Sequence, residues 1–254
     1  MIQHIESIED GKKIYFLSDF HLGVPSHAES LKREKKIIRF LDTIIPQAKA
    51  IFLLGDIFDF WFEYKYVVPK GFIRLQAKIA QITDAGIPVY VYTGNHDLWM
   101  FGYLEKELGV KIFHKPIDWE IGGKKFLIGH GDGLGPGDTV YKMTKKVFVN
   151  PFFQWVFKMT PPAIGMGIAT FWSNKSRLHN SDERFFEEKE YLWHYCKEQN
   201  VLKNRDYYIF GHRHMPLDLA VGKDGRYINI GDWIQYDTYA EFDGETLNLI
   251  SWKE

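Results

Sequence analysis

The chain has 254 residues, of which 45% are hydrophobic and 26% charged, and its formal net charge is -1. High apolar content with so low a net charge excludes an intrinsically disordered chain, and 32 basic against 33 acidic residues give no overall charge that would favour nucleic acid as a partner. The single cysteine, Cys196, excludes an internal disulfide and is typical of a reducing compartment. The first ten residues lack the apolar stretch of a secretory signal, and no run reaches the roughly 18 apolar residues of a membrane span, so we expect a cytoplasmic protein.

Strands alternate with helices in the first part of the chain. Short apolar runs rich in β-branched and aromatic residues predict buried strands at residues 14–17, 50–54, 89–92, 126–128 and 207–210. Residues 26–29 have the S-x-x-E form of a capping box and begin a predicted helix that ends before Pro46. A second helix is predicted over about 72–85, where Gly86 and Pro88 supply stop signals. This alternation predicts an α/β layered core.

Residues 135–180 differ from their surroundings in charge and in aromatic content. The segment holds six basic residues against one acidic residue, Asp138, and its aromatic-dense part, 147–172, is broken by three prolines. Predicted strands lie on both sides of it. We therefore interpret the segment as a helical cap inserted into a single domain that spans residues 1–254, and one too interrupted to cross a membrane.

The last part of the chain contains four predicted strands between glycine-containing turns, at residues 217–221, 227–230, 238–242 and 247–252. Their spacing is typical of hairpin-connected strands, and we expect them to form a second sheet. Upstream, Asp118 and Trp119 lie outside the predicted elements and are expected at the solvated surface.

Five short motifs rich in Asp, Asn and His each begin where a predicted strand ends. They are Asp19-Phe-His21, Gly55-Asp56-Ile-Phe-Asp59, Gly94-Asn95-His96-Asp97, Gly129-His130-Gly131 and Gly211-His212-Arg213-His214. One such motif alone would more often be a turn than a ligand site, but five in this order are not expected by chance. Ligands bind at the carboxyl ends of strands in layered α/β folds, and these carboxylate, imidazole and amide groups suit two divalent cations.

In this order the five motifs, which span residues 19–214, resemble the calcineurin-like metallophosphoesterase superfamily. The resemblance implies a four-layer αββα sandwich with a two-metal centre at the edge of the strands. It implies that one cation is bound by Asp19, His21, Asp56 and His214. Asp56 would bridge to the second cation, which Asn95, His130 and His212 would complete. Manganese is expected, with iron or zinc left open because these ligand types tolerate all three metals.

The same resemblance implies hydrolysis of a phosphoester. Two cations would lower the pKa of a shared water for attack on phosphorus and would clamp the phosphoryl oxygens. His96 would protonate the leaving oxygen, and Asp59 would orient His96 and favour its charged form. The alternative for His96 is a hydrogen-bonded turn histidine with no part in the reaction.

Nearly the whole chain is similar to the family of UDP-2,3-diacylglucosamine pyrophosphatases of lipid A biosynthesis, including the segments 18–22, 55–61, 130–134, 211–216 and 231–233. This resemblance implies cleavage of the diphosphate of UDP-2,3-diacylglucosamine to UMP and 2,3-diacylglucosamine 1-phosphate. It also implies head-group contacts from Asp138, Tyr141, Asn174 and Lys175. The best-known members have Arg at the position of His96 and Glu at that of Asp59, whereas both residues here match the generic superfamily dyad.

The predicted cap favours a lipid-linked nucleotide as substrate. It contains more aromatic side chains than a short surface excursion normally buries, namely Phe148, Phe152, Phe153, Trp155, Phe157, Phe171 and Trp172. The basic residues among them suit anionic head groups, so we expect peripheral association with the cytoplasmic face of the inner membrane. Packing of these aromatics on the core, or in a dimer interface, is the alternative, and the oligomeric state stays open.

Two other functions are weighed against this one. The first keeps the chemistry and changes the substrate: another metallophosphodiesterase or phosphatase that acts on a nucleotide or a phosphoprotein. The second is a metal-free binding scaffold on the same fold, which the complete set of ligand residues disfavours.

Overall fold

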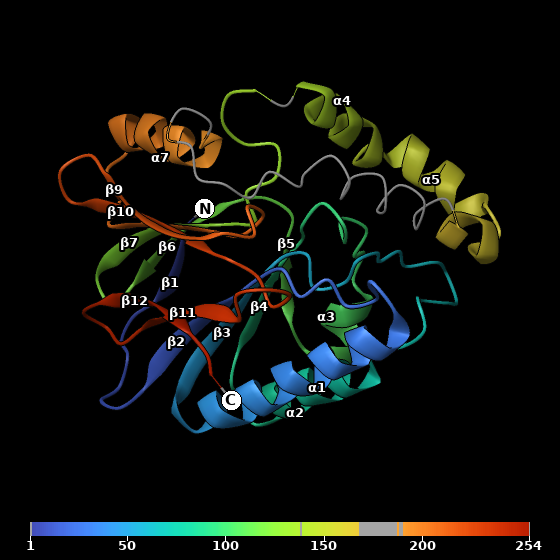
Figure 1. Cartoon of the computed structure of the whole chain (residues 1–254), viewed down its shortest axis with the longest axis horizontal. Coiled ribbons are helices and arrows are strands. Elements are labelled where there is room, and N and C mark those ends of the chain that lie inside the picture. The colour runs from blue at the N-terminus through green and yellow to red at the C-terminus, as the bar shows by residue number, and fades with distance from the viewer. Residues whose placement is uncertain (1, 138, 168–186, 188–189, 254) are drawn as a thin grey trace.

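The computed structural model describes residues 2–137, 139–167, 187 and 190–253, and its strands form two six-stranded sheets (Figure 1). The first sheet contains, in spatial order, Gln3–Ile5 (β1), Ile117–Ile121 (β6), Lys124–Ile128 (β7), Tyr207–Phe210 (β8), Gly225–Ile230 (β10) and Pro216–Val221 (β9). The second contains Leu247–Ser251 (β12), Thr238–Phe242 (β11), Lys13–Leu17 (β2), Ala48–Leu54 (β3), Val89–Tyr92 (β4) and Lys111–Phe113 (β5). Each of the five apolar runs predicted as buried strands lies in one of these strands.

Continuous apolar runs form the central strands because both faces of each sheet are covered. In β2, Ile14 and Phe16 belong to the layer between the two sheets, whereas Tyr15 and Leu17 belong to the layer beneath the helices. The Phe16 ring stacks on Phe52 of β3, with ring centroids 5.0 Å apart. Burial on both faces removes the alternation of polar and apolar residues, as is typical of parallel strands, and β2, β3, β4 and β5 are parallel.

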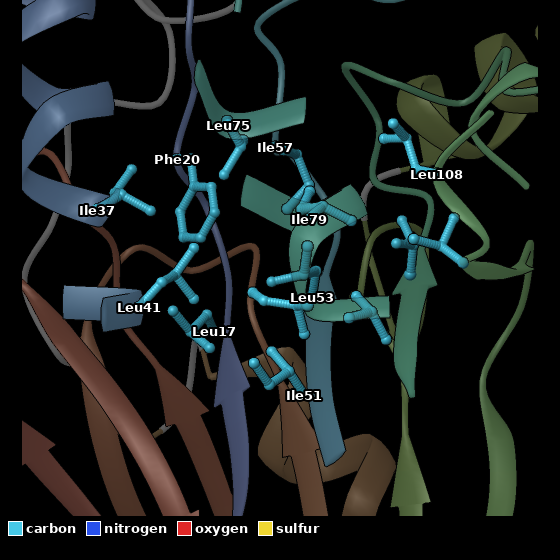
Figure 2. Close-up of a cluster of buried hydrophobic side chains, with 14 of the residues drawn as sticks. Leu17, Phe20, Ile37, Leu41, Ile51, Leu53, Ile57, Leu75, Ile79 and Leu108 are labelled. Atoms are coloured by element: carbon cyan, nitrogen blue, oxygen red, sulfur yellow. The ribbon is translucent and has the colours of Figure 1, made fainter. Parts of the chain in front are cut away.

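Helices cover the outer faces of both sheets. The second sheet is covered by α1 (His27–Ile44), α2 (Ile73–Asp84) and α3 (Tyr103–Leu108), and the first by α7 (Tyr191–Leu202). Figure 2 shows side chains of α1 and α2 packed against those of β2 and β3. Helix, sheet, sheet and helix make the predicted four-layer αββα arrangement.

The ends of the first two helices follow the predicted signals. The Ser26 hydroxyl accepts a hydrogen bond from the backbone N–H of Glu29 at 3.2 Å, as the capping box requires, and α1 ends before Pro46. α2 ends just before Gly86, whose φ of 81° lies in the left-handed region that glycine adopts without strain.

Two further helices, α4 (Thr139–Phe148) and α5 (Pro151–Met159), lie on the side of the molecule away from α1 and α2 (Figure 1). Both fall within the predicted cap, of which residues 138 and 168–180 are outside the described part of the chain. The Asn150 side chain caps α5 by accepting a hydrogen bond from the backbone N–H of Phe152 at 2.9 Å. Among the described helices, none is both long enough and apolar enough to cross a bilayer.

The four tail strands do not form a sheet of their own, so that prediction is wrong. β9 and β10 join the first sheet, where β10 pairs in parallel with β8, and β11 and β12 join the second sheet, where β11 pairs antiparallel with β2. The chain therefore crosses from the first sheet to the second between β10 and β11. Hairpin spacing predicts the strand pairs but not the sheet to which each pair adds.

Trp119 is not at the surface, which corrects the expectation for that residue. It lies in β6 and is 2% exposed in the layer between the sheets, where its Nε1 donates a hydrogen bond to the Tyr92 hydroxyl at 2.7 Å. Its neighbour Asp118 points the other way and pairs with Arg205 at 2.5 Å. Alternation of this kind is typical of a strand with one buried face.

The topology places several polar loops at one edge of the sandwich. β2, β3 and β4 run parallel in the second sheet, and β7, β8 and β10 run parallel in the first. Their carboxyl ends therefore meet at a common edge in each sheet, and the loops that follow them carry the five motifs.

Candidate metal centre

The structure brings the seven predicted metal ligands together at this edge. Three groups of side chains each place one ligand atom per residue within 4.8 Å of all the others: Asp19, His21, Asp56 and His214 in the first, Asp56, His130 and His212 in the second, and His21, Asp59 and His96 in the third. The remaining residue, Asn95, places its Oδ1 3.2 Å from Nε2 of His130. Asp56 belongs to the first two groups, which is the arrangement expected of a carboxylate shared by two cations.

Individual distances show how closely these donors converge. Oδ2 of Asp56 lies 3.5 Å from Nε2 of His21 and 3.4 Å from Nε2 of His130. The Nε2 atoms of His21 and His214 are only 3.2 Å apart. Oδ1 of Asp19 is buried and has no hydrogen-bond partner among the described residues. A buried carboxylate oxygen without a donor, set among inward-pointing imidazole nitrogens, fits the ligand set of divalent metal ions.

Backbone strain is concentrated at the candidate ligands. Five of them have a positive φ, which non-glycine residues rarely adopt: Asp19 at 57°, His21 at 43°, Asp56 at 52°, His212 at 69° and His214 at 55°. Such conformations cost free energy and cluster at functional sites, where surrounding contacts hold them. The sharp turns aim short side chains from separate loops at a common point.

Two glycines allow the loops to approach this closely. A Cβ on Gly94 would collide with the carboxylate of Asp56, and a Cβ on Gly211 would collide with the side chains of Ser18 and Asp19. Glycine at these motif positions is therefore required by space and not only by turn geometry.

Hydrogen bonds on the far ring nitrogens orient two of the histidines. Nδ1 of His130 lies 2.7 Å from the carbonyl oxygen of Leu54, and Nδ1 of His214 lies 3.1 Å from Oδ2 of Asp232. With Nδ1 as the donor, Nε2 of each ring is left to face the cluster, as in most protein metal sites. Asp232 follows β10 and was not among the predicted site residues.

Asp97 is a second supporting residue that the sequence did not reveal. Its fully buried carboxylate accepts hydrogen bonds from the backbone N–H groups of Gly94 at 2.7 Å, Ile57 at 2.8 Å and Asp56 at 3.3 Å. It thereby joins the loops after β3 and β4. Burial, together with the nearby charge of Asp56, raises the pKa of Asp97 to about 7.

The carboxylates of the cluster stabilise positive charge in a buried site. Burial alone would lower the pKa of His21 and His130, but the carboxylates of Asp19 and Asp59 beside His21, and the charge of Asp56 beside His130, raise both pKa values to about 10. Burial would raise the pKa of Asp19, yet the neighbouring His214 and His21 lower it to about 2. Among the protein groups alone, the carboxylates thus stay ionised and hold protons on His21 and His130, and two cations would supply the same positive charge.

His96 lies beside the shared carboxylate and belongs, with His21 and Asp59, to the third group, but to neither of the two groups that contain Asp56. Its backbone N–H donates to Oδ1 of Asp56 at 2.9 Å, and its ring packs edge-on against His21 with centroids 4.8 Å apart. Nδ1 of His96 lies 2.9 Å from the backbone carbonyl oxygen of Asp59 and 3.7 Å from its carboxylate. Burial lowers the pKa of His96 and outweighs the opposing charges of Asp56 and Asp59. Asp59 therefore contacts His96 more closely through its backbone than through its carboxylate.

Of the four predicted head-group contacts, the structure describes Tyr141, while Asp138, Asn174 and Lys175 lie outside the described residues. Tyr141 is in α4, and its hydroxyl donates to Oδ2 of Asp132 at 2.5 Å. Lys145, one turn further on, places its Nζ 2.6 Å from the same oxygen. The Tyr141 ring lies 6.4 Å from that of His212, so the start of α4 stands next to the candidate metal centre.

The aromatic residues of the cap divide into two sets. In the first set, the Phe157 ring packs against those of Phe62 and Trp99, with its centroid 4.7 Å from each of theirs. The carbonyl oxygen of Phe148 accepts a hydrogen bond from Nε1 of Trp99 at 2.8 Å. Three other aromatic side chains of α5 are largely exposed: Phe152 at 62%, Phe153 at 46% and Trp155 at 58%. Phe171 and Trp172 lie outside the described residues. Packing on the core therefore accounts for Phe148 and Phe157. The side chains of Phe152, Phe153 and Trp155 remain as an exposed apolar surface.

Comparison with known proteins adds independent findings. A family model described as calcineurin-like phosphoesterase matches residues 12–216. The chain is 39% identical to a UDP-2,3-diacylglucosamine hydrolase of Porphyromonas gingivalis, over 95% of this chain and 98% of the relative. It is 29% identical to a protein of the same name from Stenotrophomonas maltophilia, over 93% and 98% of the two chains, and 28% identical to one from Histophilus somni, over 87% and 92%. The family match contains all five motifs.

Proposed function

This chain belongs to the calcineurin-like phosphoesterase family, and on that premise we propose that it is a metal-dependent hydrolase of UDP-2,3-diacylglucosamine. It would cleave the diphosphate to give UMP and 2,3-diacylglucosamine 1-phosphate. The observation that carries the substrate is 39% identity over 95% of the chain to a hydrolase of that name. The two buried donor groups that share Asp56 support the reaction class.

The seven gathered residues are assigned to two divalent cations. One is held by Asp19, His21, Asp56 and His214, and the other by Asp56, Asn95, His130 and His212. Manganese is the metal we expect, with iron and zinc as the alternatives that these ligands accept. When bound, the cations would lower the pKa of a water molecule for attack on phosphorus and stabilise negative charge on the phosphoryl group.

Other groups of the chain supply orientation and a proton. Because the backbone N–H of His96 holds Asp56, the ring of the same residue stands beside the shared carboxylate. The Asp59 carbonyl occupies Nδ1 of His96, which leaves Nε2 to give a proton to the leaving oxygen. Nearby, the Lys145 ammonium neutralises Asp132 and so reduces repulsion of an anionic diphosphate.

The proposed function is tested by turnover of UDP-diacylglucosamine beside a simple nucleotide diester. The protein purified with Mn²⁺ should release UMP from the lipid substrate, lose that activity on treatment with chelator and recover it when Mn²⁺ is returned. Full turnover by a preparation verified to be metal-free would contradict the metal assignment. Turnover of the nucleotide diester in clear preference to the lipid would favour a nucleotide phosphodiesterase instead.

Residues 135–180 are proposed to form a cap over the active site that holds the acyl chains. Tyr141 lies next to His212 and, as the resemblance implies, would contact the head group together with Asp138, Asn174 and Lys175. The exposed apolar side chains of α4 and α5 lie on the same helices as the exposed Lys146 and Lys158. An apolar helical surface with interspersed lysines suits the surface of an anionic membrane, so peripheral association with the inner membrane is part of the proposal.

Replacing Phe152, Phe153 and Trp155 with serine tests the cap. These side chains are exposed, so folding should persist, while KM for the diacyl substrate should rise and hydrolysis of a small diester should be spared. Binding to vesicles that contain anionic lipid should weaken in parallel in a sedimentation assay. A matched control is serine at Val201 and Leu202, which are 87% and 79% exposed at the end of α7.

The two substrates separate the explanations of the cap. An equal loss with both would show that the segment is core structure, and no change with either would contradict the lipid proposal. The control variant should bind vesicles and hydrolyse both substrates as the unaltered protein does.

A further inference from the structure

Arg213 occupies the middle of the loop that carries two candidate metal ligands. His212 and His214 on either side of it face the metal cluster, whereas Arg213 contacts the start of α7. Its Nε lies 3.1 Å from Oε2 of Glu190, the residue that precedes α7, and its guanidinium lies 5.9 Å from the centroid of the Tyr191 ring. The side chain of Glu190 is fully buried. Burying a carboxylate costs free energy unless it is paired with a positive charge, so the ion pair with Glu190 determines the direction of the Arg213 side chain.

The ion pair continues into a chain of hydrogen bonds that returns to the same loop. The other oxygen of Glu190 accepts from the Tyr227 hydroxyl at 3.3 Å, and the Asn229 amide donates to that hydroxyl at 3.2 Å. The same amide also donates to the carbonyl oxygen of Gly211. That carbonyl in turn accepts from the backbone N–H of Arg213 at 2.8 Å, which closes the circuit. Glu190, Tyr227 and Asn229 are all fully buried.

The loop needs such support because its conformation is unfavourable by itself. His212 and His214 have φ values of 69° and 55°, in the left-handed region, and only Arg213 separates them. Strained backbone of this kind persists only where the surroundings over-determine it. The hydrogen bonds that involve Glu190 and Asn229 hold the loop at two points, the side chain of Arg213 and the carbonyl of Gly211. Both points lie on the side of the loop opposite the ligands.

We propose that Glu190 and Arg213 are positioning residues that hold His212 and His214 in the geometry required to bind metal. This inference rests on the proposed function, because it assigns the loop to a metal centre. The competing explanation is that the ion pair only anchors α7 to the first sheet.

A double variant separates positioning from anchoring. Glu190→Leu with Arg213→Met replaces the buried ion pair by an apolar pair, a change that often preserves or raises stability. We expect a melting temperature near that of the unaltered protein, but Mn²⁺ affinity weakened by roughly 10-fold to 100-fold, the usual effect of losing groups that orient metal ligands. Unchanged Mn²⁺ affinity in a folded double variant would overturn the proposal in favour of simple anchoring.

Milder variants carry the test if the double variant does not fold. Arg213→Lys keeps the charge but loses the planar guanidinium, whereas Glu190→Gln keeps the shape but replaces one of the two acceptor oxygens with an N–H₂ donor, so each variant should weaken Mn²⁺ binding. The control is Asp218→Asn with Arg226→Gln, which removes an exposed ion pair on the same sheet and should leave Mn²⁺ affinity unchanged. Equal Mn²⁺ affinity in Arg213→Lys and the unaltered protein would likewise overturn the proposal.

Hydrogen exchange at the amides of residues 211–214 provides a readout that does not depend on metal or activity. Exchange should be faster in Arg213→Lys than in the unaltered protein and the Asp218/Arg226 control, because the loop loses the contact between the guanidinium and Glu190. Equal exchange would contradict the proposal even if the metal assignment stands. Failure of the unaltered protein to bind Mn²⁺ would instead contradict the proposed function, so the two failures are distinguishable.

Discussion

Asp56→Ala is expected to remove both cations together and to lower turnover by more than roughly 100-fold, the upper effect of losing a group that merely supports a ligand. The reason is geometric: Asp56 belongs to both donor groups, and its Oδ2 lies within 3.5 Å of His21 and 3.4 Å of His130, which belong to different groups. The measurement is the metal content of the purified protein, beside turnover of UDP-diacylglucosamine at saturating Mn²⁺.

Two aspartate variants make the comparison specific. Asp19→Ala removes a residue of only one group, so it should mainly weaken one site and leave part of the bound metal in place. Asp42→Ala removes a carboxylate that pairs with Lys78 on the surface and should change neither metal content nor turnover. Loss of only half the metal in Asp56→Ala would contradict the shared role of this carboxylate.

The central strands could be predicted because their burial leaves a local trace in the sequence. β2 and β3 are covered on both faces, so their apolar runs are uninterrupted. β1 and β5 have three residues each, too few for any pattern, and in β6 Asp118 and Glu120 alternate with the buried Trp119, so the strand has no continuous apolar run. The sheet that β11 joins depends on its pairing with β2, more than two hundred residues earlier, which no local pattern can specify.

The candidate ligands could be predicted for a similar reason, since each follows directly on a recognisable strand. The supporting residues could not, because their role depends on partners that only the fold brings near. Asp97 ends one of the predicted motifs but received no role there, because it acts through the backbone N–H groups of Asp56 and Ile57, about forty residues away. Glu190 is an ordinary glutamate in the sequence and becomes significant only when β10 places Tyr227 against it.

The cap shows the limit of composition as a guide. Aromatic density identifies residues 147–172 as unusual, but it does not say which rings pack. Phe157 packs against Phe62 and Trp99, which belong to the loops after β3 and β4. Once that face of α5 is fixed, Phe152 and Trp155 are left exposed. The exposed set, and not the total, is therefore the part of the cap that bears on the lipid proposal.

His96→Ala is expected to retain both cations but to lose roughly 10²-fold to 10⁴-fold in kcat, the usual contribution of a general acid. The variant removes only the ring, since the backbone N–H that holds Asp56 is present with any residue at this position. Metal content and the melting temperature should stay close to those of the unaltered protein. In the unaltered protein kcat should fall as the pH rises and His96 loses its proton, and this limb of the profile should be absent from the variant.

Asp59→Asn separates the two ways in which Asp59 contacts His96. The closer contact, 2.9 Å to Nδ1, is made by the backbone carbonyl and survives the substitution, whereas the carboxylate lies 3.7 Å away. The loss of turnover should therefore be smaller than in His96→Ala. It should be accompanied by a lower pKa in the pH profile, because the charge of Asp59 raises the pKa of His96 against the effect of burial. Wild-type turnover in His96→Ala would instead make His96 a turn histidine, held by Asp56 and Asp59 for the sake of the loop alone.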